Sequence, residues 1–103
     1  MGIGLQIAYL GLPQTACLEA EAAVQLLRLL PYSTYISDCQ LVIEHVDQRS
    51  GSSLYEVRLE TRSAEHAVKR IARCVHDSAE AAIKCAFDKA VRVFEILSAH
   101  GKL

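Results

Sequence analysis

The closest group of reactive side chains in the sequence is formed by Cys74, His76 and Asp77. A thiol beside an imidazole and a carboxylate could act as a nucleophile or help to ligate a metal ion. Two ligands do not make a zinc site, and no second pair of Cys or His residues has the usual spacing. The sequence therefore predicts no metal and no cofactor. A small enzyme or ligand carrier that uses these three residues is the third of three hypotheses.

Sequence motifs of known catalytic sites are missing. The sequence contains no G-x-S-x-G, no glycine-rich phosphate loop and no H-E-x-x-H. His45 continues one face of an alternating apolar segment, so we predict a half-buried, hydrogen-bonded side chain rather than a catalytic base. The protein is therefore predicted not to be an enzyme, to take no small-molecule substrate and to act by binding.

The four cysteines are widely spaced, show no C-x-x-C and lie inside periodic segments: Cys17, Cys39, Cys74 and Cys85. This distribution predicts reduced, mostly buried thiols. Cys85 differs from the others, because its helical angle places it near Lys89 and Arg92 rather than on the apolar stripe. We expect it to be an exposed thiol with somewhat raised reactivity.

The charged residues nearly cancel, so any affinity for nucleic acid must come from local basic patches. The sequence contains eleven Lys and Arg residues and twelve Asp and Glu residues, which gives a formal net charge of −1. The densest basic cluster is Lys69, Arg70 and Arg73, with Lys84 expected beside it on the next helix. We predict an RNA-backbone contact here. The alternative is cross-strand pairing on the open sheet face, in which acidic and basic side chains neutralise each other: Glu44, Glu56 and Glu60 with Arg58 and Arg62.

The last helix offers a second set of cations. Lys84, Lys89 and Arg92 are predicted to contact phosphate. The alternative is a solvated face, because Glu80, Lys84, Asp88 and Arg92 alternate in sign at four-residue steps.

The first helix is apolar on two sides. Leu18, Ala22, Leu26 and Leu29 form one stripe, and only Glu21, Gln25 and Arg28 form a narrow polar edge. The second stripe is predicted to be a protein interface, since a large exposed apolar strip usually marks one. Its residues are Ala16, Ala20, Ala23, Val24, Leu27 and Leu30. The alternative is one broad stripe that faces the core.

These side chains are carried by a chain of 103 residues, of which 51% are hydrophobic, and we predict a single domain over residues 1–103. No apolar run approaches the roughly 18 residues that span a bilayer, and the N-terminus lacks the features of a signal peptide. We therefore expect a cytoplasmic location and no membrane partner.

Six elements are predicted from periodicity and turn residues. Strands are expected at residues 5–10, 38–46, 54–62 and 66–75, the last beginning at His66 with an uncertain register, and residues 47–53 form a hairpin loop. Thr15 caps a helix that Pro31 ends at about Leu30, and Ser78 caps a helix that Gly101 ends. The order β-α-β-β-β-α predicts an α+β fold with a four-stranded, antiparallel-rich sheet and both helices on one face.

In order and spacing these elements resemble the short ribosome hibernation promoting factors, also known as sigma-54 modulation proteins or ribosome-associated inhibitors. The similarity covers Leu5–Leu97. The turn at Gln14–Thr15 resembles the family's Thr-capped turn, and the strand Cys39–Glu44 matches its second strand. The core leucines of the family's first helix correspond to Leu18, Leu26 and Leu29. The most specific match is the family's last helix, where an acidic cap precedes Ala-Ala-Ile and an Asp-Lys pair follows: Ser78–Ile83 with Asp88, Lys89 and Arg92.

The resemblance implies a domain that docks on the small ribosomal subunit, in the channel for messenger and transfer RNA, and blocks translation under stress by occupancy. The positions that match the family's RNA-binding residues are Arg28, Lys89 and Arg92. The remaining candidates rest on local charge only: Lys69, Arg70, Arg73 and Lys84.

The sequence departs from the family pattern at several positions. Glu19 and Gln25 stand where Arg or Lys is expected, and Glu80 where an aromatic residue is common. Fewer cations predict weaker phosphate binding with a flatter salt dependence. The rival hypothesis is therefore a protein-interaction module of the same fold, a homodimer joined through the first helix, with RNA binding lost.

Overall fold

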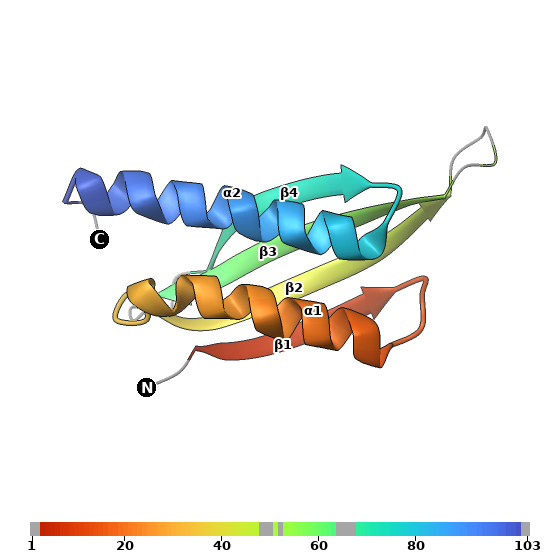
Figure 1. Ribbon diagram of the computed structural model, residues 1–103, viewed down its shortest axis with the longest axis horizontal. Helices are drawn as coiled ribbons and strands as arrows, with labels where there is room; N and C mark the ends of the chain where they lie inside the picture. Colours follow the sequence, from red (N-terminus) through yellow and green to blue (C-terminus); the bar gives the residue numbers. More distant parts are fainter. Residues whose placement is uncertain (1–2, 48–50, 52, 64–67, 102–103) are drawn as a thin grey trace.

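The computed structural model describes residues 3–47, 51, 53–63 and 68–101. Its elements follow the predicted order, with a short 3-10 helix η1 added after the first helix (Figure 1). They are β1 (Gly4–Leu10), α1 (Ala16–Leu26), η1 (Leu27–Tyr32), β2 (Ile36–Asp47), β3 (Ser53–Ser63), β4 (Val68–His76) and α2 (Ala79–Ala99). The predicted α+β architecture is confirmed.

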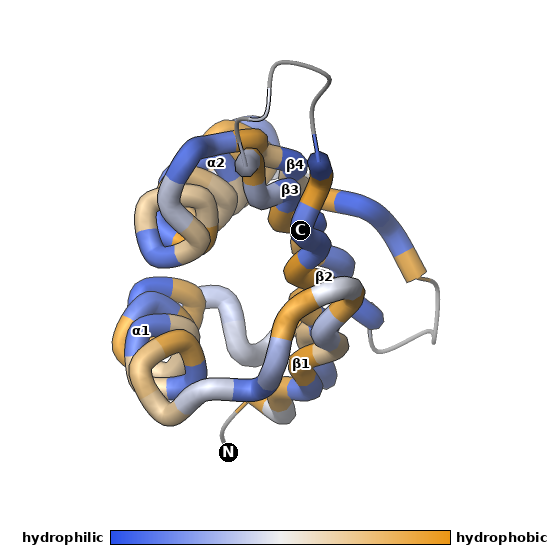
Figure 2. Tube along the Cα trace, turned by 90° about the vertical axis from the view of Figure 1, so that its right-hand side faces the viewer, coloured by the Kyte–Doolittle hydropathy of each residue, from blue (hydrophilic) through white to orange (hydrophobic). Residues whose placement is uncertain are grey.

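The four strands form one mixed sheet in the order β1-β2-β3-β4. β1 runs parallel to β2 because α1 carries the chain back between them, whereas β2, β3 and β4 pair in antiparallel fashion. Figure 2 shows α1 and α2 side by side on one side of the sheet. β1 and β4 are therefore the edge strands, and the sheet has one face covered by helices and one open face.

The core lies between the helices and the covered face. Cys39, Leu41 and Ile43 of β2 are at most 2% exposed, as their alternation predicts. Across from them, α2 contributes Ile83 and Phe87, which are completely buried. The helical stripe of α2 and the strand alternation of β2 therefore meet in one apolar layer.

Both predicted helix caps are confirmed. The Thr15 hydroxyl accepts a hydrogen bond from the Leu18 amide at 3.2 Å, and the Ser78 hydroxyl accepts one from the Ala81 amide at 3.3 Å. Each satisfies an amide that has no partner inside its helix. Gly101 follows α2 with a φ of +67°, a left-handed conformation that glycine adopts without strain.

The first helix differs from the prediction in its last turns. The α-helical part ends at Leu26, and residues 27–32 continue as the 3-10 helix η1, which contains Pro31. Because proline cannot donate a main-chain hydrogen bond, the chain leaves the α-helical geometry before it rather than after it. The prediction of Gln25 as part of a polar edge is wrong: Gln25 is only 8% exposed, and its amide oxygen accepts a hydrogen bond from Arg28 at 2.9 Å.

Two strand boundaries also differ. β2 begins at Ile36, two residues earlier than predicted. The register shifts between Ile36 and Asp38, so the buried Ile36 lies outside the period-two alternation from which the strand was predicted. β4 ends at His76, and its predicted start at His66 lies outside the described residues, as do residues 48–50 and 52 of the predicted hairpin loop.

Candidate functional site

The group Cys74, His76 and Asp77 does not form a reactive site. Cys74 is bonded to Cys85 in a disulfide, with 6.1 Å between their Cα atoms, so the prediction of reduced thiols is wrong for this pair. The prediction that Cys85 is an exposed, reactive thiol is also wrong, because its sulfur is bonded to that of Cys74. The exposed His76 ring instead contacts the Asp77 carboxylate at 2.7 Å. A thiol engaged in a disulfide is not available as a nucleophile or as a metal ligand.

A hollow lies beside this group but includes neither its thiol nor its imidazole. This open hollow of about 450 Å³ lies between the first turns of the two helices, and its lining includes Asp77 but neither Cys74 nor His76. Within residues 3–47, 51, 53–63 and 68–101, no three His, Cys, Asp or Glu side chains come together as metal ligands. In the same ranges, no helix combines the length and apolar character needed to cross a bilayer.

The other two cysteines are free thiols that differ in their exposure to solvent. Cys39 is buried, and burial raises the pKa of its thiol to about 12, which keeps it protonated and unreactive. Cys17 is exposed on α1, against the expectation of a mostly buried set. Spacings of three and four residues place Cys17 on the same side of the helix as Ala20 and Val24.

A β-bulge divides the predicted basic cluster of β4. The register shifts between Leu59 and Glu60, so Ile71 of β4 has no partner on β3. As a result Lys69 lies opposite the buried Thr61, on the helix-covered side, whereas Arg70 lies opposite Glu60 on the open face. Arg73, which pairs with Arg58, also belongs to the open face. The uncertain register of this strand thus has a physical cause.

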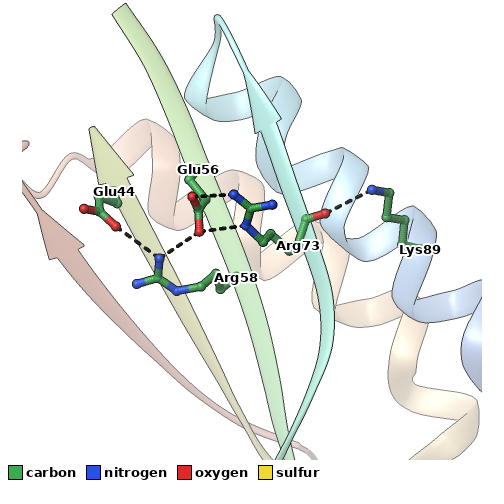
Figure 3. Close-up of polar contacts among 5 residues, drawn as sticks. All are labelled: Glu44, Glu56, Arg58, Arg73 and Lys89. Atoms are coloured by element: carbon green, nitrogen blue, oxygen red, sulfur yellow. Dashed lines mark hydrogen bonds and ion pairs between the residues drawn. The ribbon is translucent and has the colours of Figure 1, made fainter. Parts of the chain in front are cut away.

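On the open face the predicted alternative, ion pairing between acidic and basic side chains, is confirmed for Glu44, Glu56 and Arg58, and Arg73 joins the same cluster (Figure 3). Arg58 donates to Glu44 at 3.1 Å and to Glu56 at 2.8 Å. Arg73 approaches the same Glu56 carboxylate at 3.0 Å. Glu56 thus bridges two guanidinium groups, and hydrogen bonds from Arg73 and Arg58 lower the pKa of its carboxyl from 4.5 to about 2.

This bridge predicts a pH-dependent contribution to stability. Because the pKa of Glu56 is lower in the folded chain, its stabilisation is present above the unfolded value near 4.5 and is lost as the pH falls towards 2. We expect Glu56→Gln to lower the free energy of unfolding by roughly 1 kcal/mol at pH 6 and by nearly nothing at pH 2. This figure is reduced to allow for the screening of the exposed Arg73 by solvent. Urea unfolding of both proteins between pH 6 and pH 2 measures this difference. Glu95→Gln, on the exposed side of α2, is the control, and a Glu56→Gln deficit that does not change with pH would contradict the assignment.

Two cations of α2 lie along β4. Cys85, Lys89 and Arg92 follow at four and three residues, so they share one side of the helix, and the disulfide fixes that side against β4. The Lys89 amine donates to the main-chain carbonyl of Arg73 at 3.0 Å (Figure 3). The prediction that Cys85 lies near Lys89 and Arg92 on α2 is therefore confirmed. The strand next to this side of the helix is β4.

Arg28 and Lys84 lie apart from this edge. Arg28 belongs to η1 and forms an ion pair with Asp88 of α2 at 2.5 Å, which ties the two helices together. Lys84 lies on the ridge of α2 that also carries Glu80 and Asp88, at four-residue spacing. Acidic neighbours thus accompany both cations. Arg92 follows Asp88 by four residues and continues this ridge, but it also lies with Lys89 on the Cys85 side of α2.

The remaining cations form what we call the β4 rim. These five side chains come from the edge strand and from the adjacent side of α2, and all five residues are exposed: Lys69, Arg70, Arg73, Lys89 and Arg92. Glu56 offsets the charge of Arg73 in part. Cations that follow one edge of a molecule are suited to track a phosphate backbone. The structure thus gathers five of the seven predicted RNA-binding residues along a single edge.

The second apolar stripe of the first helix is exposed to solvent. Val24 is 58% exposed, Leu27 62% and Leu30 41%, while Ala20 and Ala23 are also exposed. The alternative of one broad core-facing stripe is therefore wrong for these positions. They form, together with Cys17, what we call the α1 strip.

The sequence reasoning missed one structural link, the disulfide between Cys74 and Cys85. A signal was present, because the two residues flank a short turn from strand to helix and Cys85 was expected off the apolar stripe. A helix that packs back on the preceding strand brings such a pair together. The same step would have placed Lys89 beside β4.

Comparisons with known proteins bear on the fold. No protein-family model matches the sequence, and no curated protein matches it. Among solved structures, the chain is similar to a ribosomal subunit interface protein from Coxiella burnetii, with a TM-score of 0.76 and 13% identity over 94% of this chain and 99% of the other. It is also similar to the N-terminal domain of Thermus thermophilus Protein Y, with a TM-score of 0.72 and 16% identity over the same shares. The fold of these two proteins extends over nearly the whole chain, which confirms the fold that the resemblance implied.

Proposed function

We propose that this protein is a ribosome-associated factor that binds RNA of the small subunit and inhibits translation by occupancy, without chemistry. The observation that carries the proposal is the match of fold over 94% of the chain with a protein named a ribosomal subunit interface protein. Because identity is 13%, the fold supports the class of partner and the chain's own surface must supply the contacts.

The β4 rim is the surface we assign to this contact. Lys89 and Arg92 are also positions that match the family's RNA-binding residues, so charge and resemblance agree on them. Arg28 matches as well, but Asp88 holds its guanidinium at 2.5 Å, and phosphate would have to compete with that carboxylate. We therefore expect Arg28 and Lys84 to contribute less than the rim.

The test is co-sedimentation of the purified protein with small ribosomal subunits over a salt series from 50 to 300 mM. Binding through the rim predicts that the logarithm of the binding constant falls linearly with the logarithm of salt concentration, with a slope set by the few phosphate contacts that five cations can make. Bovine serum albumin is the control for non-specific trapping. If the protein does not co-sediment with small subunits at 50 mM salt, the proposed function is contradicted.

A second candidate function is a protein-interaction module that forms a homodimer through the α1 strip. The observation that favours it is the exposure of Val24 and Leu27, each more than half accessible, on a helix that otherwise packs on the sheet. Contiguous apolar residues of this kind usually mark an interface. In this case the fold would be kept while the RNA surface is not used.

The homodimer hypothesis predicts that Leu27→Glu converts a dimer into a soluble, folded monomer. A carboxylate in a buried interface would lose its hydration without gaining a partner, so the dissociation constant should rise at least tenfold. Light scattering measures the mass, and alkylation of Cys17 on the same strip should become faster in the monomer. Val75→Glu, which changes an exposed apolar residue of β4, is the matched control. A wild-type protein that is monomeric at 100 µM, by contrast, rules the homodimer out.

A further inference from the structure

We propose that the Cys74–Cys85 disulfide is a reversible redox clamp that sets the geometry of the β4 rim. It is a covalent connection between β4 and α2, with an 11-residue sequence separation between its ends. Each half of the rim lies next to one of the two cysteines. Arg73 precedes Cys74 directly, and Lys89 lies one turn after Cys85.

The clamp acts where the two halves of the rim meet. The Lys89 amine donates to the Arg73 carbonyl at 3.0 Å, and this exposed hydrogen bond spans the same seam as the disulfide. Once the disulfide opens, this exposed hydrogen bond is the one polar contact between Lys89 and the described residues of β4. An exposed hydrogen bond restrains a lysine only weakly, so the cations of α2 gain freedom relative to those of β4.

The rest of the fold does not depend on the bond. The completely buried side chains Ile83, Phe87 and Ala90 hold α2 on the sheet, and Arg28 ties the helix to η1 through Asp88. Reduction is therefore expected to loosen the seam and leave the domain folded, which is the behaviour that a switch requires.

The chemistry is a two-electron thiol–disulfide exchange with a dithiol reductant. Cys85 is partly exposed whereas Cys74 is only 3% exposed, so the reductant thiolate attacks the Cys85 sulfur. The Cys74 sulfur leaves as a thiolate and takes up a proton. The second thiol of the reductant then resolves the mixed disulfide, which releases the Cys85 thiol and oxidises the reductant to its own disulfide.

For ribosome binding this inference rests on the proposed function. Oxidised protein presents the rim in one arrangement and avoids the ordering cost on binding, so it should bind small subunits about three- to tenfold more tightly than reduced protein. The structural effect does not rest on that function. Main-chain amides of β4 and of the first half of α2 should exchange hydrogen about tenfold faster after reduction.

The experiment uses the full chain, oxidised or reduced with dithiothreitol, with the redox state read by alkylation and intact mass. Hydrogen exchange and co-sedimentation are then measured on both forms, on the variant C74A/C85A and on the control Cys17→Ala. We expect the double variant to behave like the reduced form in either buffer, and Cys17→Ala to respond to reduction like the wild type.

Each outcome decides the inference. Faster exchange at the seam with intact circular dichroism, together with weaker subunit binding on reduction, supports it. Equal binding by both forms overturns the regulation and leaves the proposed function standing. If neither form binds, the proposed function fails, and the exchange data alone decide the clamp. Failure to form the bond under oxidant, or global unfolding on reduction, overturns the clamp itself.

Discussion

Reversing the charge of Lys89 and Arg92 together is expected to weaken binding to small ribosomal subunits about 100-fold at 100 mM salt, that is by about 2.7 kcal/mol. Each reversal removes one phosphate contact and adds a repulsive carboxylate. The slope of the logarithm of the binding constant against the logarithm of salt concentration should become shallower by about 1 for each lost contact. Co-sedimentation of K89E/R92E across the salt series measures both quantities.

The structure supplies a matched control for this variant. Arg62 is an exposed cation of β3, next to the last residue of that strand, Ser63, and it is not one of the five cations of the β4 rim. Arg62→Glu changes the net charge by the same amount per residue and should lower the affinity less than threefold. Equal losses for reversals inside and outside the rim would mean that net charge alone governs binding, and the rim assignment would fall.

The largest effect on stability is expected from Phe87→Ala, which should lower the free energy of unfolding by about 3 to 5 kcal/mol. Phe87 is completely buried in the layer between α2 and the sheet, where Leu41 and Ile43 are also completely buried. Removing the ring loses its transfer free energy and leaves a cavity that the rigid sheet cannot close. For a domain of this size, a loss of that magnitude approaches the whole stability.

Urea unfolding followed by circular dichroism measures this loss, with Phe87→Leu as the conservative comparison. Leucine fills most of the volume, so its deficit should be clearly smaller than that of alanine. Replacement of the exposed Ile96 by alanine, on the same helix, should cost less than about 1 kcal/mol. Similar losses for Phe87→Ala and Ile96→Ala would contradict the packing described above.

Local patterns were enough to predict most of the fold. The alternation of Cys39, Leu41 and Ile43 identified the buried face of β2, and Thr15 and Ser78 identified the starts of both helices. These features depend on neighbours within a few residues, where the periods of strands and helices and the geometry of a cap act directly. The exposed α1 strip could be predicted for the same reason, since helical periodicity separates its residues from Leu18 and Leu29.

By itself, then, the sequence determined the order of the elements, their faces and the types of side chain available for binding. Only the tertiary structure decided how the cations are grouped. The bulge at Ile71 separates Lys69 from Arg70, and the ion pair between Arg28 and Asp88 joins residues 60 positions apart. Strand register and helix packing create these relations between segments that are distant in sequence, and no local period encodes them.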